Sequence, residues 1–305
     1  MENSFRSGYV ALVGPPNAGK STFLNGVLGE KVAIVSPKPG TTRTAITGIW
    51  TTDSAQVVFV DTPGIVASRG RMQRLLAEAA WAALASAHGA VVFLDGARYA
   101  ARSSALVRDV HSFAPRLRQL GIPLAVAVNK IDQVAPKARL LAVLAACAKL
   151  WPGADIFPVS ARTGEGRDRL EAAILAMVPE GPPLFPADQL SSAPLRFLAA
   201  EVVREQLFLQ LHQELPYHVA VEVEEWAEEP GLTSIGVVIY VSKTSHKAMI
   251  IGRAGSRLKA VGQAARQALK ELLGTKVHLS TWVKVREGWT EDEEFLREMN
   301  IGEVL

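Results

Sequence analysis

The stretch Gly14-Pro15-Pro16-Asn17-Ala18-Gly19-Lys20-Ser21-Thr22 decides the fold of this chain. It follows a short apolar run over residues 8–13 and precedes a helical pattern over 20–29. A G-x-x-x-x-G-K-S sequence between a strand and a helix predicts a loop whose backbone N–H groups converge on a phosphate. In such a loop Lys20 would reach the β- and γ-phosphates, and the Ser21 hydroxyl would ligate Mg²⁺. The stretch therefore predicts a nucleotide-binding α/β fold, without indicating which nucleotide is bound.

Residues 1–180 alternate between strand-like and helix-like segments around this loop. The predicted strands are short, continuous apolar runs, at 8–13, 56–61, 89–95, 122–128 and 155–159. Such runs are typical of strands that are buried on both faces of a parallel sheet. Helical patterns lie between them, at 20–29, 71–86, 101–119, 136–150 and 165–177, and a strand at 45–52 can add one antiparallel edge. We predict an α/β P-loop domain with a mixed, mostly parallel sheet and helices on both faces.

The pattern changes after a proline-rich stretch, residues 179–186, which contains four prolines. A segment this rich in proline does not form a regular element, and we assign residues 181–193 to a semi-rigid linker. Beyond it, residues 194–287 read helix, strand, strand, helix, helix, strand, which predicts a compact α+β domain. Residues 288–305 are assigned to a C-terminal tail.

The composition restricts the class of protein. Apolar residues make up 49% and charged residues 21% of the 305 residues, as in globular proteins with a sizeable core. The single cysteine, Cys147, lies in an apolar helical run, which indicates a buried thiol, excludes an internal disulfide and fits a reducing compartment. No stretch approaches the roughly 20 consecutive apolar residues of a membrane span, the first strand begins too early for a signal peptide, and the six histidines lack metal-ligand spacing. We therefore expect a cytoplasmic protein without a zinc site.

The charges are distributed unevenly along the chain. Residues 1–184 hold 20 Lys and Arg against 13 Asp and Glu, whereas residues 185–305 hold 13 against 17. Within that acidic half, residues 243–286 contain ten basic residues against one acid, Glu271. This basic block is a local patch that the near-neutral charge of the whole chain conceals.

Three motifs that follow predicted strands select the nucleotide. Asp61-Thr62-Pro63-Gly64 reads D-x-x-G, in which the carboxylate can hold Mg²⁺ through water and the glycine N–H can reach the γ-phosphate. In Asn129-Lys130-Ile131-Asp132, the acceptor-only carboxylate of Asp132 matches the paired N1–H and N2 donors of guanine. A backbone N–H of Ser160-Ala161 can donate to guanine O6. Together with the phosphate loop, these motifs predict GTP.

A polar loop, Pro39-Gly40-Thr41-Thr42-Arg43, lies between the first helix and the predicted hairpin. A threonine hydroxyl there can complete the Mg²⁺ shell only when the γ-phosphate is present, which would make the loop a switch; an ordinary mobile loop is the alternative. Lys20 and Mg²⁺ would supply the charge for phosphoryl transfer. Ile65, the residue after Gly64, cannot orient water, so we expect slow intrinsic turnover. The side chain of Asn17 either holds a monovalent cation beside the phosphates or caps the loop backbone.

An RNA-binding surface is predicted around Gly252-Arg253-Ala254-Gly255, a G-x-x-G sequence between the helices predicted at 244–251 and 256–273. Its glycines would let a phosphate backbone approach closely. Nearby basic side chains would attract RNA in a salt-dependent manner, and two isoleucines could form an apolar floor for bases. The predicted RNA-contacting residues beside the glycines and Ala254 are Lys243, Lys247, Ile250, Ile251, Arg253, Arg257 and Lys259. A solvated basic helix is the alternative.

These motifs resemble those of the translation-factor-class GTPases related to TrmE, Era and EngA. The Pro-Asn-x-Gly-Lys-Ser loop and the Pro-Gly-Thr-Thr-Arg segment resemble the subgroup that contains Era, MnmE and Der. One GTPase domain followed by a type II KH domain, and the ending at 284–289, resemble the Era family within it. By motif match, Thr42 is the better Mg²⁺ candidate of the two threonines, and Asn17 matches the asparagine linked to potassium activation. Arg162 departs from the lysine that usually follows Ser-Ala, which matters little if Ser160 and Ala161 act through their backbone.

The resemblance implies a GTPase that binds 16S rRNA near its 3′ end, assists assembly of the 30S subunit and associates in part with the inner membrane as a peripheral protein. We expect it to be a monomer whose nucleotide state gates RNA binding. An RNA-binding adaptor in which GTP is structural is an alternative. A tRNA-modifying enzyme similar to MnmE would need a cysteine near the C-terminus, which this sequence lacks.

Overall fold

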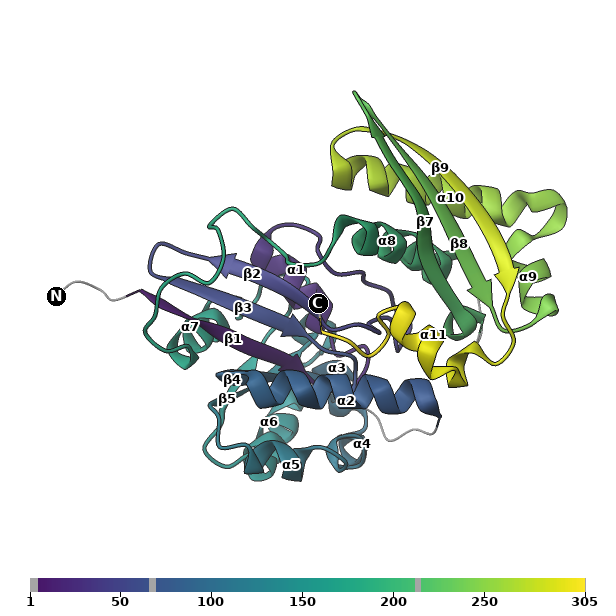
Figure 1. The fold of residues 1–305 in the computed structure, drawn as a ribbon. Coiled ribbons are helices and arrows are strands. Elements are labelled where there is room, and N and C mark those ends of the chain that lie inside the picture. The colour runs from purple at the N-terminus through teal and green to yellow at the C-terminus, as the bar shows by residue number, and fades with distance from the viewer. Residues whose placement is uncertain (1–4, 66–69, 212–214, 305) are drawn as a thin grey trace.

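The computed structural model describes residues 5–65, 70–211 and 215–304. It contains a larger domain at the N-terminal side and a smaller one that lies against one end of it (Figure 1). Both domain types agree with the sequence prediction, a P-loop α/β domain followed by an α+β domain. In the described part of the chain, no helix is both long enough and apolar enough to span a lipid bilayer.

The first domain is built on a six-stranded sheet with the order β2-β3-β1-β4-β5-β6. Only β2 runs antiparallel to its neighbour, as the sequence predicts for the edge strand. The strands span Arg6–Val13 (β1), Ile46–Thr51 (β2), Ala55–Asp61 (β3), Gly89–Asp95 (β4), Leu124–Asn129 (β5) and Asp155–Pro158 (β6). The central strands are almost wholly buried, because helices cover both faces.

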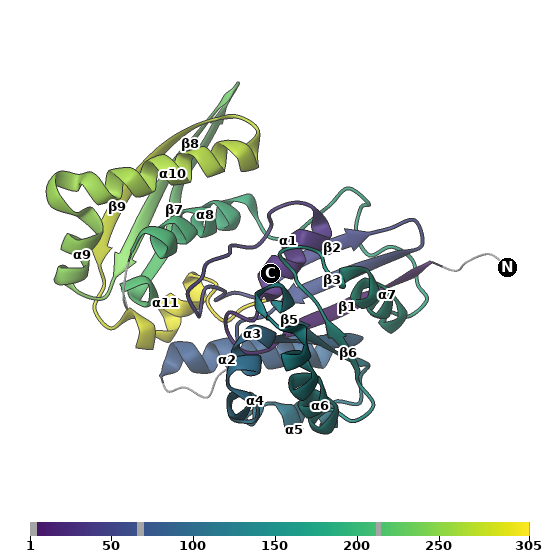
Figure 2. The same cartoon turned by 180° about the vertical axis from the view of Figure 1, so that it is seen from behind.

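Helices α1 and α7 cover one face of this sheet and α2 to α6 the other (Figures 1 and 2). They span Lys20–Leu28 (α1), Arg71–Ser86 (α2), Gly96–Ala101 (α3), Ser103–Val110 (α4), Ala114–Gln119 (α5), Leu140–Leu150 (α6) and Arg167–Met177 (α7). The single helix predicted over 101–119 is therefore wrong. Arg102 has non-helical φ and ψ of −143° and 82°, and Pro115 lies in the first turn of α5, where its missing N–H costs no hydrogen bond.

The proline-rich segment lies along the edge of the first domain. The Ser7 hydroxyl donates to the Pro182 carbonyl at 2.7 Å, and the Gln56 side chain accepts from the N–H groups of Leu184 and Phe185 at 2.7 and 2.9 Å. Further on, the Ile49 N–H donates to the Leu190 carbonyl at 2.9 Å. The segment is thus attached to the strands that it passes and does not act as a free spacer.

The second domain pairs three strands in the order β7-β8-β9, with β8 antiparallel to β7 and parallel to β9. Helices α8 and α10 pack on one face of this sheet through a shared apolar core. The elements span Leu195–Gln210 (α8), Val219–Glu229 (β7), Leu232–Val241 (β8), Thr244–Ile251 (α9), Ser256–Leu273 (α10) and Lys276–Val285 (β9). The element order is the one that the sequence predicts.

The C-terminal segment packs between the two domains. After a turn at Trp289–Glu291, helix α11 (Glu293–Glu298) places Phe295 and Leu296 against Ala220 of the second sheet and Leu76 of α2. The Arg71 backbone N–H also donates to the Glu291 carboxylate at 3.0 Å. Residues assigned to a tail from the sequence therefore join the domains, as the yellow segment of Figure 1 shows.

Candidate functional site

The predicted phosphate loop connects β1 to α1, with Pro15, Pro16, Asn17 and Ala18 forming its turn and Thr22 already inside the helix. Gly14 and Gly19 both have positive φ, of 139° and 97°. A Cβ at Gly14 would lie 2.3 Å from the Phe93 carbonyl oxygen, and one at Gly19 would lie 2.2 Å from the Asn129 amide nitrogen. Only glycine fits at either position, and the loop leads into the N-terminus of α1, the arrangement that binds phosphate.

Three oxygen-bearing side chains predicted as Mg²⁺ ligands converge beside this loop. The Ser21 hydroxyl donates to Asp61 Oδ2 at 2.5 Å, and it lies 3.3 Å from the Thr42 hydroxyl. Asp61 Oδ1 is buried and has no hydrogen-bond partner among residues 5–65, 70–211 and 215–304. A buried, unpartnered carboxylate oxygen beside two hydroxyls matches the oxygen ligands that Mg²⁺ prefers, so the residues present fit the ion. Thr41 instead bonds within its own loop, with its hydroxyl 2.8 Å from Ser36 Oγ.

The electrostatics of Asp61 lead to a pH prediction. Burial raises the pKa of the Asp61 carboxyl to about 6, against the opposing influence of Lys20 and of the Ser21 hydrogen bond. Because Mg²⁺ needs the carboxylate, a proton competes with the ion below that pKa and not above it. We expect the Mg²⁺ affinity of the GDP-bound protein to be constant above about pH 7 and to fall about tenfold per unit below pH 6. Titration with Mg²⁺ between pH 5 and 8, with Asp61→Asn as the control, measures this; a flat profile would contradict it.

Lys20 is buried beside Asp61, and its ammonium donates to the Pro15 carbonyl at 3.4 Å. Burial lowers the pKa of Lys20, an effect that the nearby Asp61 charge partly offsets. A cleft lined by the phosphate loop and by residues of the 34–42 segment lies in front of it. A phosphate bound in this cleft would therefore place negative charge beside the buried Lys20 ammonium.

Thr62, Pro63 and Gly64 carry the chain from β3 past the phosphate loop. The Thr62 hydroxyl donates to the Leu12 carbonyl at 2.8 Å, and a Cβ at Gly64 would lie 2.6 Å from the Pro16 backbone nitrogen. Ile65 is buried, and its N–H donates to the Gly14 carbonyl at 3.1 Å. The side chain at this position therefore packs into the core and orients no water.

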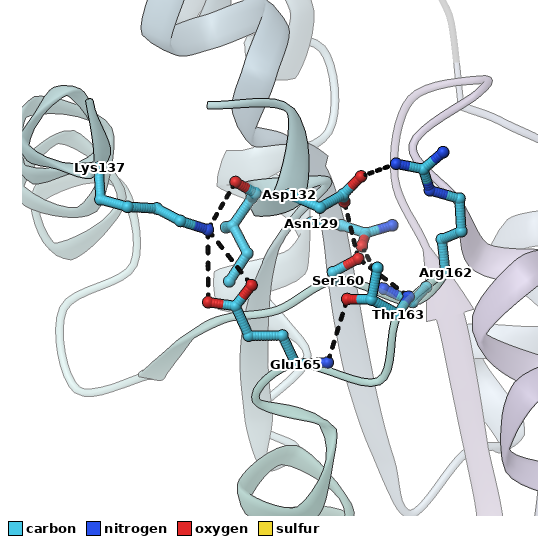
Figure 3. A network of polar contacts seen from close by, with 9 residues as sticks. Asn129, Asp132, Lys137, Ser160, Arg162, Thr163 and Glu165 are labelled. Atoms are coloured by element: carbon cyan, nitrogen blue, oxygen red, sulfur yellow. Dashed lines mark hydrogen bonds and ion pairs between the residues drawn. The ribbon is translucent and has the colours of Figure 1, made fainter. Parts of the chain in front are cut away.

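The predicted base-reading residues meet at the ends of β5 and β6 (Figure 3). Asn129 bridges two loops, because its amide donates to the Ala18 carbonyl and accepts from the Ala161 N–H, both at 2.8 Å. The Ser160 hydroxyl donates to Asp132 Oδ1 at 2.7 Å. Lys130 (φ 63°) reaches back to Asp95 at 2.7 Å, and Ile131 is buried. Ser160 thus holds the Asp132 carboxylate directly, whereas Asn129 ties the phosphate loop to the Ala161 backbone.

Arg162 takes part in this site, and the Ser160 hydroxyl contacts Asp132, so the condition under which Arg162 would matter little, that Ser160 and Ala161 act only through their backbone, is not met. Its guanidinium forms an ion pair with Asp132 Oδ2. Burial alone would raise the pKa of Asp132, but the hydrogen bonds from Ser160 and Arg162 lower it below its ordinary value. Asp132 is therefore a carboxylate at neutral pH. A guanine that binds there would share Asp132 with Arg162 or replace Arg162 as its partner. In the sequence, the position of Arg162 directly after Ser160-Ala161 is the signal that could have indicated this contact.

Asn17 does not cap the phosphate loop. It has φ 60°, is exposed, and its amide nitrogen donates to the Pro37 carbonyl of the opposite loop at 3.2 Å. Its amide oxygen makes no hydrogen bond to any residue that the structure describes. That oxygen is available for a monovalent cation beside the phosphates, in line with one of the two readings of the sequence.

Replacing Asn17 with Ala should therefore remove any potassium stimulation of GTP hydrolysis, because the oxygen is deleted. Turnover measured at equal ionic strength in KCl and in NaCl should become the same in the variant, while GDP affinity stays close to that of the unchanged protein. If KCl still stimulates the variant, Asn17 does not hold the cation, and its side chain serves only to bond Pro37.

The G-x-x-G sequence forms an exposed turn between α9 and α10. Gly252 and Gly255 have φ of 72° and 74°, and Ala254 between them has φ 50°. Lys243, Arg253 and Lys259 are exposed, Lys247 is half-buried, and none of the four takes part in an ion pair between described residues. Arg257 donates to the Met249 carbonyl at 2.6 Å. These unpaired cations surround a strained loop, the geometry expected of a phosphate-backbone contact.

The apolar floor predicted from Ile250 and Ile251 needs correction. Ile250 is 0% exposed and belongs to the core between the second sheet and its helices, so its side chain is not available to a base. Ile251 is partly buried against the same core. Met249, which the sequence analysis did not single out, is 50% exposed and is the apolar side chain that α9 presents to solvent there.

Comparisons with known proteins identify the types of both domains. The family model described as a 50S ribosome-binding GTPase matches residues 9–130, and that of the KH domain matches residues 214–290. GTPase Era of Desulfovibrio desulfuricans is 50% identical over 97% of both chains. GTPase Era of Nitratidesulfovibrio vulgaris (strain Miyazaki F) is 50% identical over 98% of both.

Two solved structures match nearly the whole chain. A variant of Era from Aquifex aeolicus bound to GDP and AlF₄⁻ covers 99% of it with a TM-score of 0.91 and 37% identity. Era in complex with MgGDPNP and nucleotides 1506–1542 of 16S ribosomal RNA covers 99% with a TM-score of 0.90 and 36% identity.

Proposed function

The chain belongs to the Era family of GTPases, and from that premise we propose that it binds 16S rRNA near the 3′ end, assists 30S assembly and binds RNA according to its nucleotide. It is a GTPase that uses GTP, GDP and Mg²⁺ and carries a KH domain for RNA. The observation that supports gating is the position of residues 30–45, which we call the switch loop. Its Thr42 faces Ser21, while its Val35 N–H donates at 2.9 Å to Glu205 of α8 in the KH domain.

The residues at the nucleotide end act by binding and orientation. Lys20 and the backbone of residues 14–19 hold the phosphates, and Asp132 accepts from guanine. Ser21, Thr42 and Asp61 are the side chains that would hold Mg²⁺, which neutralises charge on the transferred phosphoryl group. Ile65 offers no group to orient water, so intrinsic turnover should be slow and another group must assist.

The domain boundaries that go with this function are 1–180 for the GTPase domain and 194–287 for the KH domain, joined by 181–193 and followed by 288–305. We place the protein in the cytoplasm as a monomer; peripheral association with the inner membrane stays an expectation from the family resemblance. Potassium, held by Asn17, is a proposed second ion.

Ultraviolet crosslinking to total RNA tests the proposal when the protein is loaded with a non-hydrolysable GTP analogue or with GDP. We expect fragments from the 3′ end of 16S rRNA to be enriched in the GTP-analogue sample. Equal recovery with both nucleotides would favour the RNA-binding adaptor with structural GTP. Recovery of other RNA alone would contradict the rRNA assignment.

A further inference from the structure

The switch loop is bonded on both of its sides. Thr42 faces the predicted Mg²⁺ site, and the next residue, Arg43, points the opposite way into the KH domain and is 4% exposed. Lys38, four residues earlier than Thr42, donates to the carbonyls of Phe208 and Leu211 at the end of α8. The loop that would respond to the γ-phosphate therefore cannot shift without disturbing contacts to the second domain.

Arg43 makes the most extensive of these contacts. Its two terminal nitrogens donate to the carbonyls of Val219 and Tyr217 at 2.6 and 3.0 Å. The guanidinium carbon lies 5.8 Å from the centre of the Phe208 ring and 5.7 Å from that of Trp289. A planar guanidinium between two aromatic rings, with its fork on two backbone carbonyls, is a geometry that lysine cannot reproduce.

The backbone beside Arg43 holds the C-terminal segment as well. The Gly302 N–H donates to the Arg43 carbonyl at 2.9 Å, the Thr44 hydroxyl to the Asn300 carbonyl at 2.7 Å, and the Ala45 N–H to the Glu303 carbonyl at 2.8 Å. Residues 43–45 thus tie the switch loop to the KH domain and to the segment that packs on α2.

One strand pair and one helix connect the carbonyls that accept from Arg43 to the G-x-x-G turn. Val219 begins β7 and pairs with Val241, the last residue of β8. Lys243 follows two residues later and precedes α9, which ends at Ile251, directly before Gly252. The route from Thr42 to the G-x-x-G turn therefore runs through one side chain, one strand pair and one helix.

Burial of the charged Arg43 side chain costs electrostatic free energy. Burial first, and then the charge of Arg204, lower the pKa of Arg43 to about 9, although Glu201 and Tyr217 oppose the shift. Movement of the switch loop would break the contacts of this buried cation. We therefore expect the loop to occupy two discrete positions and not to shift gradually.

We propose that Arg43 couples the two sites. Thr42 stays at the nucleotide only while the Arg43 side chain is hydrogen-bonded to the KH domain. The proposal rests on the proposed function, since it names the residue through which nucleotide state would gate RNA binding. Arg43 is a positioning residue, because it acts through Thr42 and through the KH backbone. By linkage, RNA bound to the KH domain would in turn favour the closed switch loop.

The test uses the full chain with Arg43→Gln and Arg43→Lys, and with Lys31→Gln as the matched control. Lys31 forms an ion pair with Glu205 across the same interface, but its side chain is half-exposed, and its replacement leaves the Val35–Glu205 hydrogen bond and all Arg43 contacts in place, so it should leave the coupling unchanged. The RNA probe is a transcript of 16S rRNA nucleotides 1506–1542. Its affinity is measured with GTP analogue and with GDP, beside GDP affinity and thermal unfolding.

In the unchanged protein and in Lys31→Gln we expect RNA to bind about tenfold or more tightly with the GTP analogue than with GDP. This ratio of affinities is within the range typical of allosteric coupling. In Arg43→Gln that ratio should fall to within about twofold, and Arg43→Lys should lie between, while GDP affinity is unchanged. An Arg43→Gln protein that folds and keeps the full ratio would overturn the role of Arg43 alone. If Arg43→Gln does not fold, an unreduced ratio in Arg43→Lys would overturn it equally. An unchanged protein without any ratio would overturn this inference and the proposed gating together.

Discussion

Replacing Asp132 with Asn is expected to lower GTP affinity by about 10²- to 10⁴-fold and to raise affinity for xanthosine triphosphate. The carboxylate can accept from both N1–H and N2 of guanine, and two hydrogen bonds to a charged group contribute roughly 3–6 kcal/mol. Xanthine has an oxygen in place of the N2 amine, so the amide of the variant can donate there while its oxygen accepts from N1–H. Asp132 is poised for this role, since the Ser160 hydroxyl holds it at 2.7 Å.

Competition binding with GTP, GDP and xanthosine triphosphate measures the exchange of preference. Arg162→Gln is the matched control, because it removes the other partner of Asp132 but leaves the carboxylate. We expect the control to keep its preference for guanine. GTP affinity that is unchanged in Asp132→Asn would remove this residue from base reading.

Replacing Gly255 with Asp should lower RNA affinity by more than about tenfold, because the new carboxylate faces the phosphates that the loop would receive. A Cβ at Gly255 would have no neighbour within 4 Å among the residues that the structure describes, so the change costs only the strain of φ 74°. Gly252 is a less clean site, since a Cβ there would lie 2.8 Å from Arg257 Cβ. GTP turnover without RNA should stay within about twofold, because the nucleotide site lies in the other domain.

Gly274→Asp is a matched control for that change. Gly274 also has positive φ, 64°, and a Cβ there would likewise have no neighbour within 4 Å in the described part of the chain, but Gly274 follows the end of α10, at the far side of the KH domain. It therefore adds the same charge and similar strain away from the G-x-x-G turn. Filter binding across a salt series should show lost affinity for Gly255→Asp only; equal losses in both variants would place the RNA elsewhere.

The nucleotide site could be predicted from the sequence because its chemistry is local. Each motif follows a strand, and parallel strands bring their carboxyl ends to one edge, so Ser21, Asp61 and Asp132 were assigned without knowledge of distances. The interruption between α4 and α5 was not predicted, although Pro115 lies in the first turn of the second of these helices.

Contacts between segments far apart in the chain could not be predicted in the same way. The burial of Arg43 depends on carbonyls of residues 217 and 219 and on the ring of Trp289, and no local pattern encodes those distances. Ile250 is predicted to offer an apolar surface to bases beside the G-x-x-G turn, whereas helix α9 turns its side chain into the core. The C-terminal segment read as a tail, yet its Phe295 and Leu296 fill the gap between sheet and α2.

The central claim is that nucleotide state and RNA binding are coupled, and a closed thermodynamic cycle tests it most directly. Affinity for the 1506–1542 RNA is measured with GTP analogue and with GDP, and the relative affinity for the two nucleotides is measured with and without that RNA. We expect the same factor, about tenfold or more, on both arms of the cycle, because coupling between two sites is reciprocal. Equal RNA affinity with both nucleotides, together with nucleotide affinities that RNA leaves unchanged, would contradict it.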